Sequence, residues 1–92
     1  MLFAVHALDA PDSRRSQHYD QHKSHLTRTP DYGVTLVIGG PLLGVDGVSV
    51  VGSLMVFQAP DLPSVRRYND DDPFRKNGVW CTVHISQFDR ST

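Results

Sequence analysis

The sequence VWCTVHISQF, residues 79–88, is the stretch that decides the fold of this chain. Apolar side chains recur at positions 79, 81, 83 and 85 and alternate with the residues at 80, 82, 84 and 86. Successive side chains of a β-strand point to opposite faces, so this period of two predicts a closing strand with one buried face. Cys81 belongs to the apolar set, which predicts a buried, unreactive thiol, and a single cysteine excludes an intramolecular disulfide framework.

The residues before this strand predict a turn and, before the turn, a helix. Asn77-Gly78 is a turn dipeptide, and the acidic run 70–72 followed by Pro73 ends a helical pattern. Asp61 can begin that helix, because its side-chain oxygen accepts hydrogen bonds from the free amides of a first turn. Apolar side chains at 62, 65 and 68 have near-helical spacing, and Pro63 is tolerated in the first turn.

Three more strands and one more helix are predicted in the first two thirds of the chain. Short apolar runs bounded by turn residues predict strands over 2–8, over 33–43, where the apolar residues 35–38 lead into Gly39-Gly40-Pro41, and over 48–57. Asp46-Gly47 is a hairpin turn dipeptide between the last two. Asp12 or Ser13 can cap a helix that extends to about residue 29, where a proline stops it.

The predicted order is strand, helix, strand, strand, helix, strand. This order is the α+β, ferredoxin-like βαββαβ pattern, in which a four-stranded antiparallel sheet carries both helices on one face. The opposite face is then uncovered. Two such sheets packed face to face would cover each other, so we expect a homodimer.

Length and charge narrow the classes of function. Ninety-two residues suit one domain, residues 1–92. Nine basic and ten acidic residues give a net charge of −1, which favours neither nucleic acid nor an anionic membrane as partner. The first residues lack the basic region of a secretory signal, and no apolar run approaches the roughly 20 residues of a membrane span. We therefore expect a cytoplasmic protein.

Histidines and aspartates are the residues most suited to chemistry. His18, His22 and His25 share one broad face of the first predicted helix, and Asp72 stands between the acidic run and Pro73. A carboxylate can fix and polarise an imidazole for proton transfer. Taken singly, each has a structural interpretation: a helix histidine is most often structural, and an aspartate before proline often caps a turn.

The sequence favours neither a metal nor a nucleotide cofactor. His18 and His22 have the i, i+4 spacing of helical zinc ligands, but the chain has no glutamate and no second histidine pair to complete the motif. Gly39-Gly40-Pro41 lacks the following Lys-Ser/Thr of a phosphate loop. We expect these glycines to let a strand bend or to let backbone approach a ligand closely. We expect no cofactor, and a small molecule as ligand.

Taken together, several segments resemble the YCII-related (YciI-like) family over nearly the whole chain. The resemblance rests on the order and spacing of the segments MLFAV (1–5), HKSHL (22–26), LVIGGP (36–41), GSLMVF (52–57), DDDPF (70–74) and GVW (78–80). It implies a ferredoxin-like subunit that forms a dimeric α/β barrel. It also implies a histidine–aspartate pair in a cleft, here His22 and Asp72. Where the family carries an arginine shortly before the histidine, this chain has Tyr19-Asp20-Gln21.

Two functions follow as hypotheses. In the first, the chain is a lyase- or isomerase-type enzyme that acts on a small cyclic or aromatic molecule, as the resemblance to dehydrochlorinases and muconolactone isomerases implies. His22 would be the acid–base group and Asp72 would orient it, while Gly40, Pro41, Ser53 and Phe74 would contact the substrate. Backbone amides near Gly39 and Gly40, with Ser53, would bind an oxyanion or enolate oxygen, and Trp80 would complete an apolar wall. In the second, the same cleft binds a small ligand or a protein without catalysis. Pairing of a partner strand with the sheet edge is a third, weaker alternative.

Overall fold

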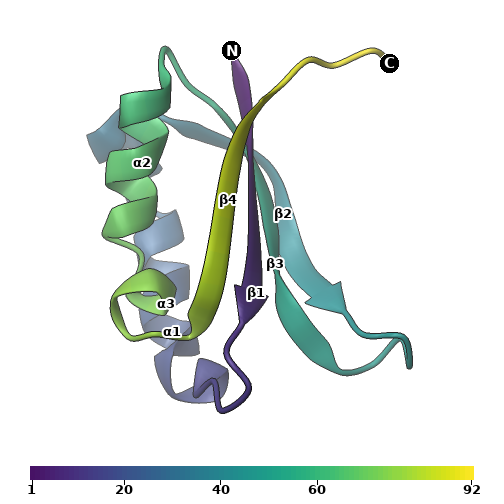
Figure 1. The fold of residues 1–92 in the computed structure, drawn as a ribbon. Helices are drawn as coiled ribbons and strands as arrows, with labels where there is room; N and C mark the ends of the chain where they lie inside the picture. Colours follow the sequence, from purple (N-terminus) through teal and green to yellow (C-terminus); the bar gives the residue numbers. More distant parts are fainter.

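The computed structural model describes residues 1–92 and contains one antiparallel sheet with helices on one side (Figure 1). The strands are β1 (Leu2–Asp9), β2 (Thr35–Leu43), β3 (Val50–Gln58) and β4 (Trp80–Phe88), in the spatial order β2-β3-β1-β4. The helices are α1 (Arg15–Leu26), α2 (Leu62–Asp70), the short α3 (Pro73–Lys76) and a 3₁₀ turn at Thr29–Tyr32. The predicted ferredoxin-like order is confirmed, with α3 and the 3₁₀ turn added.

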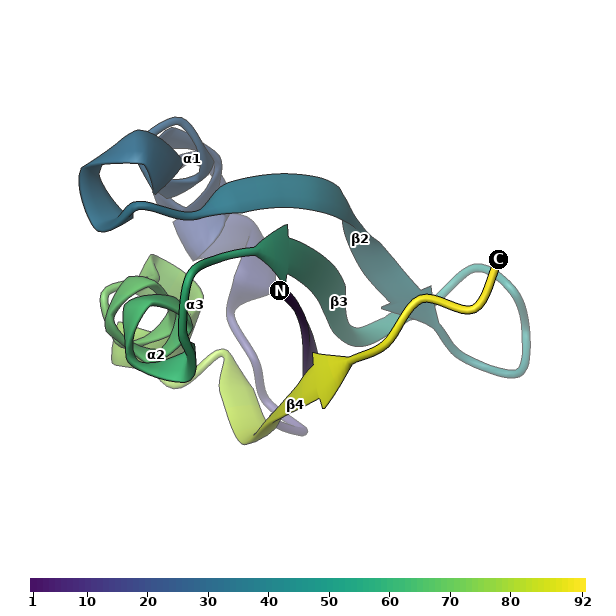
Figure 2. The same ribbon diagram turned by 90° about the horizontal axis from the view of Figure 1, so that it is seen from above.

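The sheet and helices form two layers. Seen from above, α1 and α2 lie side by side on one face of the curved sheet (Figure 2). The core between the layers includes Phe3 and Val5 from β1, Phe57 from β3 and Tyr68 from α2, all at most 2% exposed. None of the helices has the length and hydrophobicity of a transmembrane span.

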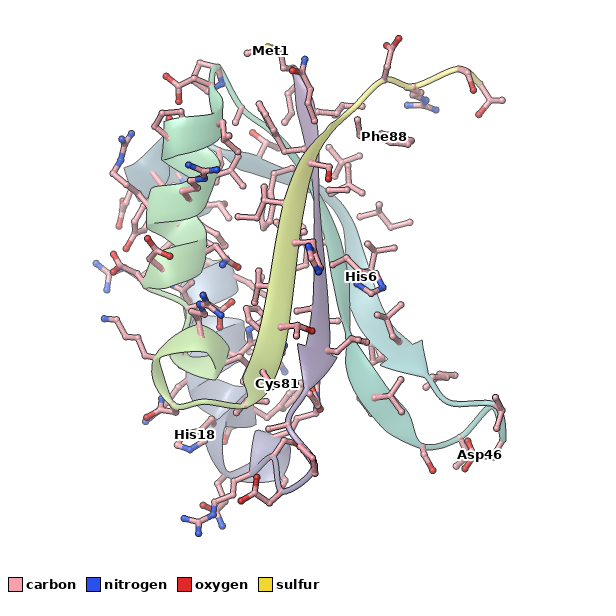
Figure 3. All side chains as sticks on the ribbon, in the orientation of Figure 1. Met1, His6, His18, Asp46, Cys81 and Phe88 are labelled. Carbon is pink, nitrogen blue, oxygen red and sulfur yellow. The ribbon has the colours of Figure 1, made fainter.

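The second face of the sheet has no covering layer. His6 extends from this face, away from the helices (Figure 3). Apolar side chains also remain exposed there, including Ile38 at 66% and Phe88 at 47%. The molecule therefore leaves an apolar surface open on the side opposite its helices, as the predicted topology requires.

A β-bulge changes the alternation predicted for β4. Leu8 of β1 pairs with Thr82, but Asp9 pairs with Trp80, so one residue is left over between them. That residue is Cys81, which is exposed, and the prediction of a buried thiol is wrong. A bulge inserts one extra residue and reverses the faces beyond it, which brings Trp80 to the buried side beside the core.

The ends of α1 also differ from the prediction. Asp61 caps α2 as predicted, because its carboxylate accepts the backbone N–H of Ser64 at 2.9 Å. Neither Asp12 nor Ser13 caps α1, which begins at Arg15 and has no side-chain cap. The hydroxyl of Ser13 instead donates to Asp9 at 3.3 Å. The helix ends at Leu26, before its predicted limit.

Candidate active site

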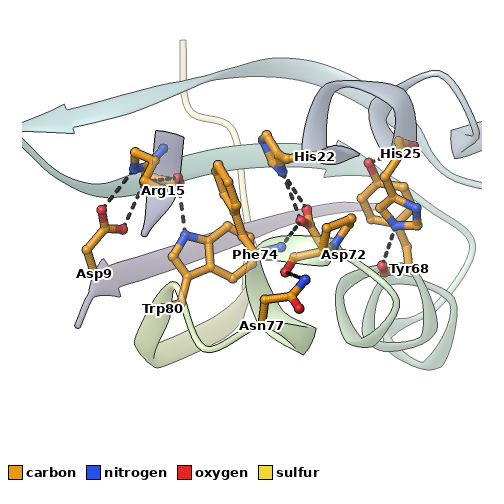
Figure 4. A network of polar contacts seen from close by, with 11 residues as sticks. Asp9, Arg15, His22, His25, Tyr68, Asp72, Phe74, Asn77 and Trp80 are labelled. Atoms are coloured by element: carbon orange, nitrogen blue, oxygen red, sulfur yellow. Dashed lines mark hydrogen bonds and ion pairs between the residues drawn. The ribbon is translucent and has the colours of Figure 1, made fainter. Parts of the chain in front are cut away.

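His22 and Asp72 meet between α1 and the start of α3. Both carboxylate oxygens of Asp72 lie 2.9 Å from Nδ1 of His22 (Figure 4). Asp72 is fully buried and also caps α3, because its Oδ1 accepts the backbone N–H of Phe74 at 2.9 Å. Pro73 suits the first helical position after such a cap, since it has no N–H to leave unpaired. The Asp-Pro-Phe sequence thus holds a carboxylate in a fixed, water-free position.

Aromatic rings fix the plane of the His22 imidazole. Phe74 stacks on it with a centroid distance of 4.0 Å and an interplanar angle of 5°. Trp80 meets it edge-on at 6.2 Å. An ionised carboxylate can only accept, so in the neutral imidazole Nδ1 carries the proton toward Asp72 and Nε2 holds a lone pair. Nε2 has no hydrogen-bond partner in the protein and is not sealed from solvent.

Nε2 faces a cavity of about 210 Å³ between α1 and the strands β2 and β3. Its lining is mainly apolar and contains Arg15, Tyr19, His22, Leu26, Leu36, Gly39, Gly40, Pro41, Val50, Ser53 and Met55. Of the four residues predicted to contact a substrate, Gly40, Pro41 and Ser53 line the cavity. Phe74 does not line it, because it is fully buried behind the imidazole.

Strand register explains how β2 contributes to the cavity. Gly39 pairs with Met55 and Pro41 with Ser53, so these positions face the helices, whereas Gly40 pairs with Leu54 on the open side. Backbone amides of a strand lie in the plane of the sheet. The amides of Gly39 and Gly40 therefore do not project from the sheet face as the predicted oxyanion donors would.

Arg15 is the polar residue of the cavity wall that the sequence did not single out. Its Nε and Nη2 donate to the two oxygens of Asp9 at 2.8 and 2.9 Å, and Nη2 also donates to Ser53 Oγ at 2.8 Å. The guanidinium lies 4.7 Å from the ring centre of Phe74. Arg15 precedes His22 by seven residues, two helical turns, so both side chains lie on one face of α1. That helical spacing is the signal in the sequence that could have pointed to Arg15.

The other two histidines of α1 have different surroundings. His25 is buried, and its Nε2 donates to the backbone carbonyl of Tyr68 at 2.8 Å, while its ring stacks on the Tyr68 ring at 4.2 Å. Nδ1 of His18 is sealed from solvent and has no hydrogen-bond partner. Of the three, His22 alone contacts Asp72, and it alone lines the cavity.

Burial and charge shift two tyrosine pKa values beside this site. Burial raises the pKa of Tyr68, and the nearby charge of Asp72 raises it further. The pKa of Tyr32 is raised first by the hydrogen bond that its hydroxyl donates to Asp71. The pKa of Asp71 is lowered by the same bond. Both phenols therefore stay protonated near neutral pH and act as structural donors.

Comparison with protein families identifies the chain. The model of the YCII-related domain matches residues 1–89, and the chain belongs to this family. No curated protein sequence matches it significantly.

Comparison with solved structures supports the same fold. The 5-chloro-2-hydroxyhydroquinone dehydrochlorinase of Burkholderia phenoliruptrix AC1100, in complex with 2,5-dihydroxybenzoquinone, superposes with a TM-score of 0.84 at 25% identity, covering 99% of this chain and 96% of that enzyme. A protein from Arabidopsis thaliana superposes at 0.60 with 7% identity, covering 99% and 95%. A dimeric ferredoxin-like protein of unknown function from Thermobifida fusca YX superposes at 0.51 with 14% identity, covering 95% and 88%. The last two show the fold alone.

Proposed function

We propose that this chain is a small lyase- or isomerase-type enzyme in which His22 exchanges protons with a hydroxylated six-membered ring. One observation carries the proposal: the buried Asp72 holds Nδ1 of His22 and leaves Nε2 as a base facing an apolar cavity. Asp72 orients the imidazole and stabilises its protonated form. Proton transfer by a positioned side chain contributes about 10²- to 10⁴-fold to a rate.

The size and lining of the cavity support a single-ring substrate. A cavity of about 150 Å³ holds benzene, so about 210 Å³ leaves room for one ring with small substituents. The similar dehydrochlorinase suggests chlorinated hydroxyhydroquinones as the substrate class. Gly40 and Pro41 would bound the ring, Ser53 would contact a ring oxygen, and Phe74 would support the imidazole.

Loss of HCl from such a ring requires proton transfers and no oxidant. Two hydroxyl protons leave, one proton is added at the carbon that bears chlorine, and chloride departs with the bonding electron pair. A hydroxybenzoquinone and HCl are the products. A single base that takes a hydroxyl proton and returns a proton to carbon suits this sequence, and in the proposal His22 makes both transfers. The proposed reaction needs no metal or organic cofactor.

We also propose that the subunit works as a homodimer formed through the open face of the sheet. Exposed apolar side chains such as Ile38 and Phe88 support this assembly. Light scattering of the purified protein should give twice the subunit mass of 10.3 kDa. A mass of one subunit at micromolar concentration would contradict it.

Chloride release from 5-chloro-2-hydroxyhydroquinone tests the proposed activity. The wild type should release chloride and hydroxybenzoquinone in equal amounts, and His22→Gln should lose at least 100-fold in kcat. His18→Gln is the matched control on the same helix and should keep its rate, because His18 does not line the cavity. Tight binding of the ring without turnover by the wild type would favour the non-catalytic module instead.

A further inference from the structure

Ser53 is held by two donors from different elements. Its Oγ accepts from Nη2 of Arg15 at 2.8 Å and from Nε1 of Trp80 at 3.3 Å. Neither donor atom can accept, so the hydroxyl acts as acceptor in both bonds. A hydroxyl has two lone pairs and one proton, and both lone pairs are now occupied.

The proton of Ser53 has no acceptor within the protein. No hydrogen bond donated by its hydroxyl is present, although the residue is only 4% exposed. Ser53 lines the cavity that His22 also lines. Cβ and the two donors occupy three of the four tetrahedral directions around Oγ of Ser53. The O–H bond therefore takes the fourth direction. We infer that Ser53 is a fixed hydrogen-bond donor in the cavity, built to bind an acceptor-only oxygen of the substrate.

The charge beside Ser53 indicates which oxygen is favoured. Arg15 polarises the hydroxyl, but Asp9 binds the same guanidinium through two hydrogen bonds and offsets its charge. Nη1 of Arg15 makes no hydrogen bond in the protein, and Arg15 belongs to the same wall of the cavity. The wall thus presents donors without a large net charge, which suits a carbonyl or a delocalised phenolate oxygen.

This inference rests on the proposed function and defines its substrate more closely. His22 presents an acceptor and Ser53 presents a donor to one cavity. The state of the ring that matches both groups has a hydroxyl at one position and a phenolate or carbonyl oxygen at another, which a chlorinated hydroxyhydroquinone reaches when one of its hydroxyl groups is ionised. A ring whose oxygens all carry protons should bind less tightly, because a hydroxyl oxygen is a weaker acceptor for the fixed O–H donor of Ser53. Arg15 and Trp80 are positioning residues, since they act through Ser53.

Ligand binding to the wild type and to Ser53→Ala tests the inference. The probes are 2,5-dihydroxybenzoquinone and 1,2,4-benzenetriol, measured by calorimetry without oxygen. Ser53→Ala should weaken quinone binding about tenfold and triol binding less than threefold, because one hydrogen bond is lost only with the acceptor. The carbonyl stretch of the bound quinone should move to higher frequency in the variant. Ser53→Cys keeps the size with a weaker donor and should fall between the two, and Ser24→Ala, on the exposed side of α1, should match the wild type.

The outcomes separate this inference from the proposed function. Equal weakening of both probes, or an unchanged carbonyl stretch, would mean that Ser53 is only structural, and this inference would fail while the role of His22 stood. If the wild type bound neither probe, the proposed substrate class would fail and the inference with it. Trp80→Phe removes one of the two donors while keeping an aromatic ring, and it should weaken quinone binding about threefold.

Discussion

Replacement of Asp72 by asparagine exchanges one hydrogen-bond acceptor beside His22 for a donor and keeps the size of the side chain. Oδ1 of Asp72 accepts both from Nδ1 of His22 and from the amide of Phe74, and Oδ2 accepts from His22 alone. In Asp72→Asn the oxygen stays with the Phe74 amide, which needs an acceptor. The new NH₂ group then faces Nδ1 at the place of Oδ2, where two donors would meet. The imidazole relieves this contact by carrying its proton on Nε2, so the lone pair in the cavity disappears.

The expected effect is large on catalysis and moderate on stability. Loss of the correctly protonated base should lower kcat about 10³-fold, within the range for acid–base catalysis and equivalent to about 4 kcal/mol. A lost charge-assisted hydrogen bond to a buried group costs about 1.5–3 kcal/mol of unfolding free energy. Domains of this size are commonly stable by about 5–15 kcal/mol, so Asp72→Asn should still fold at 25 °C.

Chloride release gives kcat, and long-range ¹H–¹⁵N NMR identifies which nitrogen of His22 carries the proton. Circular dichroism confirms folding of each variant. The reasoning predicts Nδ1–H in the wild type, Nε2–H in Asp72→Asn, and the 10³-fold loss together with this change. If Asp72→Asn kept its rate within tenfold while the proton moved to Nε2, orientation by Asp72 would not explain the activity.

Three further predictions concern the frame around the site. His25→Gln should lower the unfolding free energy in urea by about 1–3 kcal/mol, because its bond to the carbonyl of Tyr68 is lost, yet leave kcat unchanged. A Cβ at residue 52 would overlap a carbonyl oxygen of β1, so Gly52→Ala should cost about 3 kcal/mol and lower Tm, whereas Gly40→Ala, with open space around its Cβ, should keep Tm. The pKa of Asp46 is lowered from 3.8 to about 2, chiefly by the hydroxyl of Ser49 and then by backbone amides. This contribution to stability is present above pH 4 and lost as the pH falls toward 2, so the stability difference between the wild type and Asp46→Asn should shrink over that window and be constant above it.

Most of the fold could be predicted from local patterns in the sequence. The cap at Asp61 and the turn at Asn77-Gly78 each depend on neighbours in the chain, and the structure has both, while the period of two in the closing strand holds from Thr82 onward. The exposure of Cys81 could not be predicted in the same way. The bulge at Cys81 depends on how β4 pairs with β1, more than seventy residues away, and no local pattern encodes that register.

The candidate site was harder to predict than the fold, because it is formed by contacts between residues far apart in the sequence. Helical spacing places three histidines on one face, but it cannot show which of them is functional. The partner of His22 lies 50 residues away in the sequence, and the partner of His25 lies 43 residues away. The family resemblance selected His22, and the structure then placed it beside Asp72. Arg15 was missed because its role comes from contacts with Asp9 and, 38 residues away, Ser53.

A crystal structure of the protein with 2,5-dihydroxybenzoquinone tests the central claim most directly, namely that Nε2 of His22 works on a ring in this cavity. The account predicts the ring between α1 and β3, with one oxygen about 2.6–3.2 Å from Nε2 of His22 and another within hydrogen-bond distance of Ser53 Oγ. A quinone bound elsewhere on the protein, or one in the cavity with no oxygen within reach of Nε2, would contradict it.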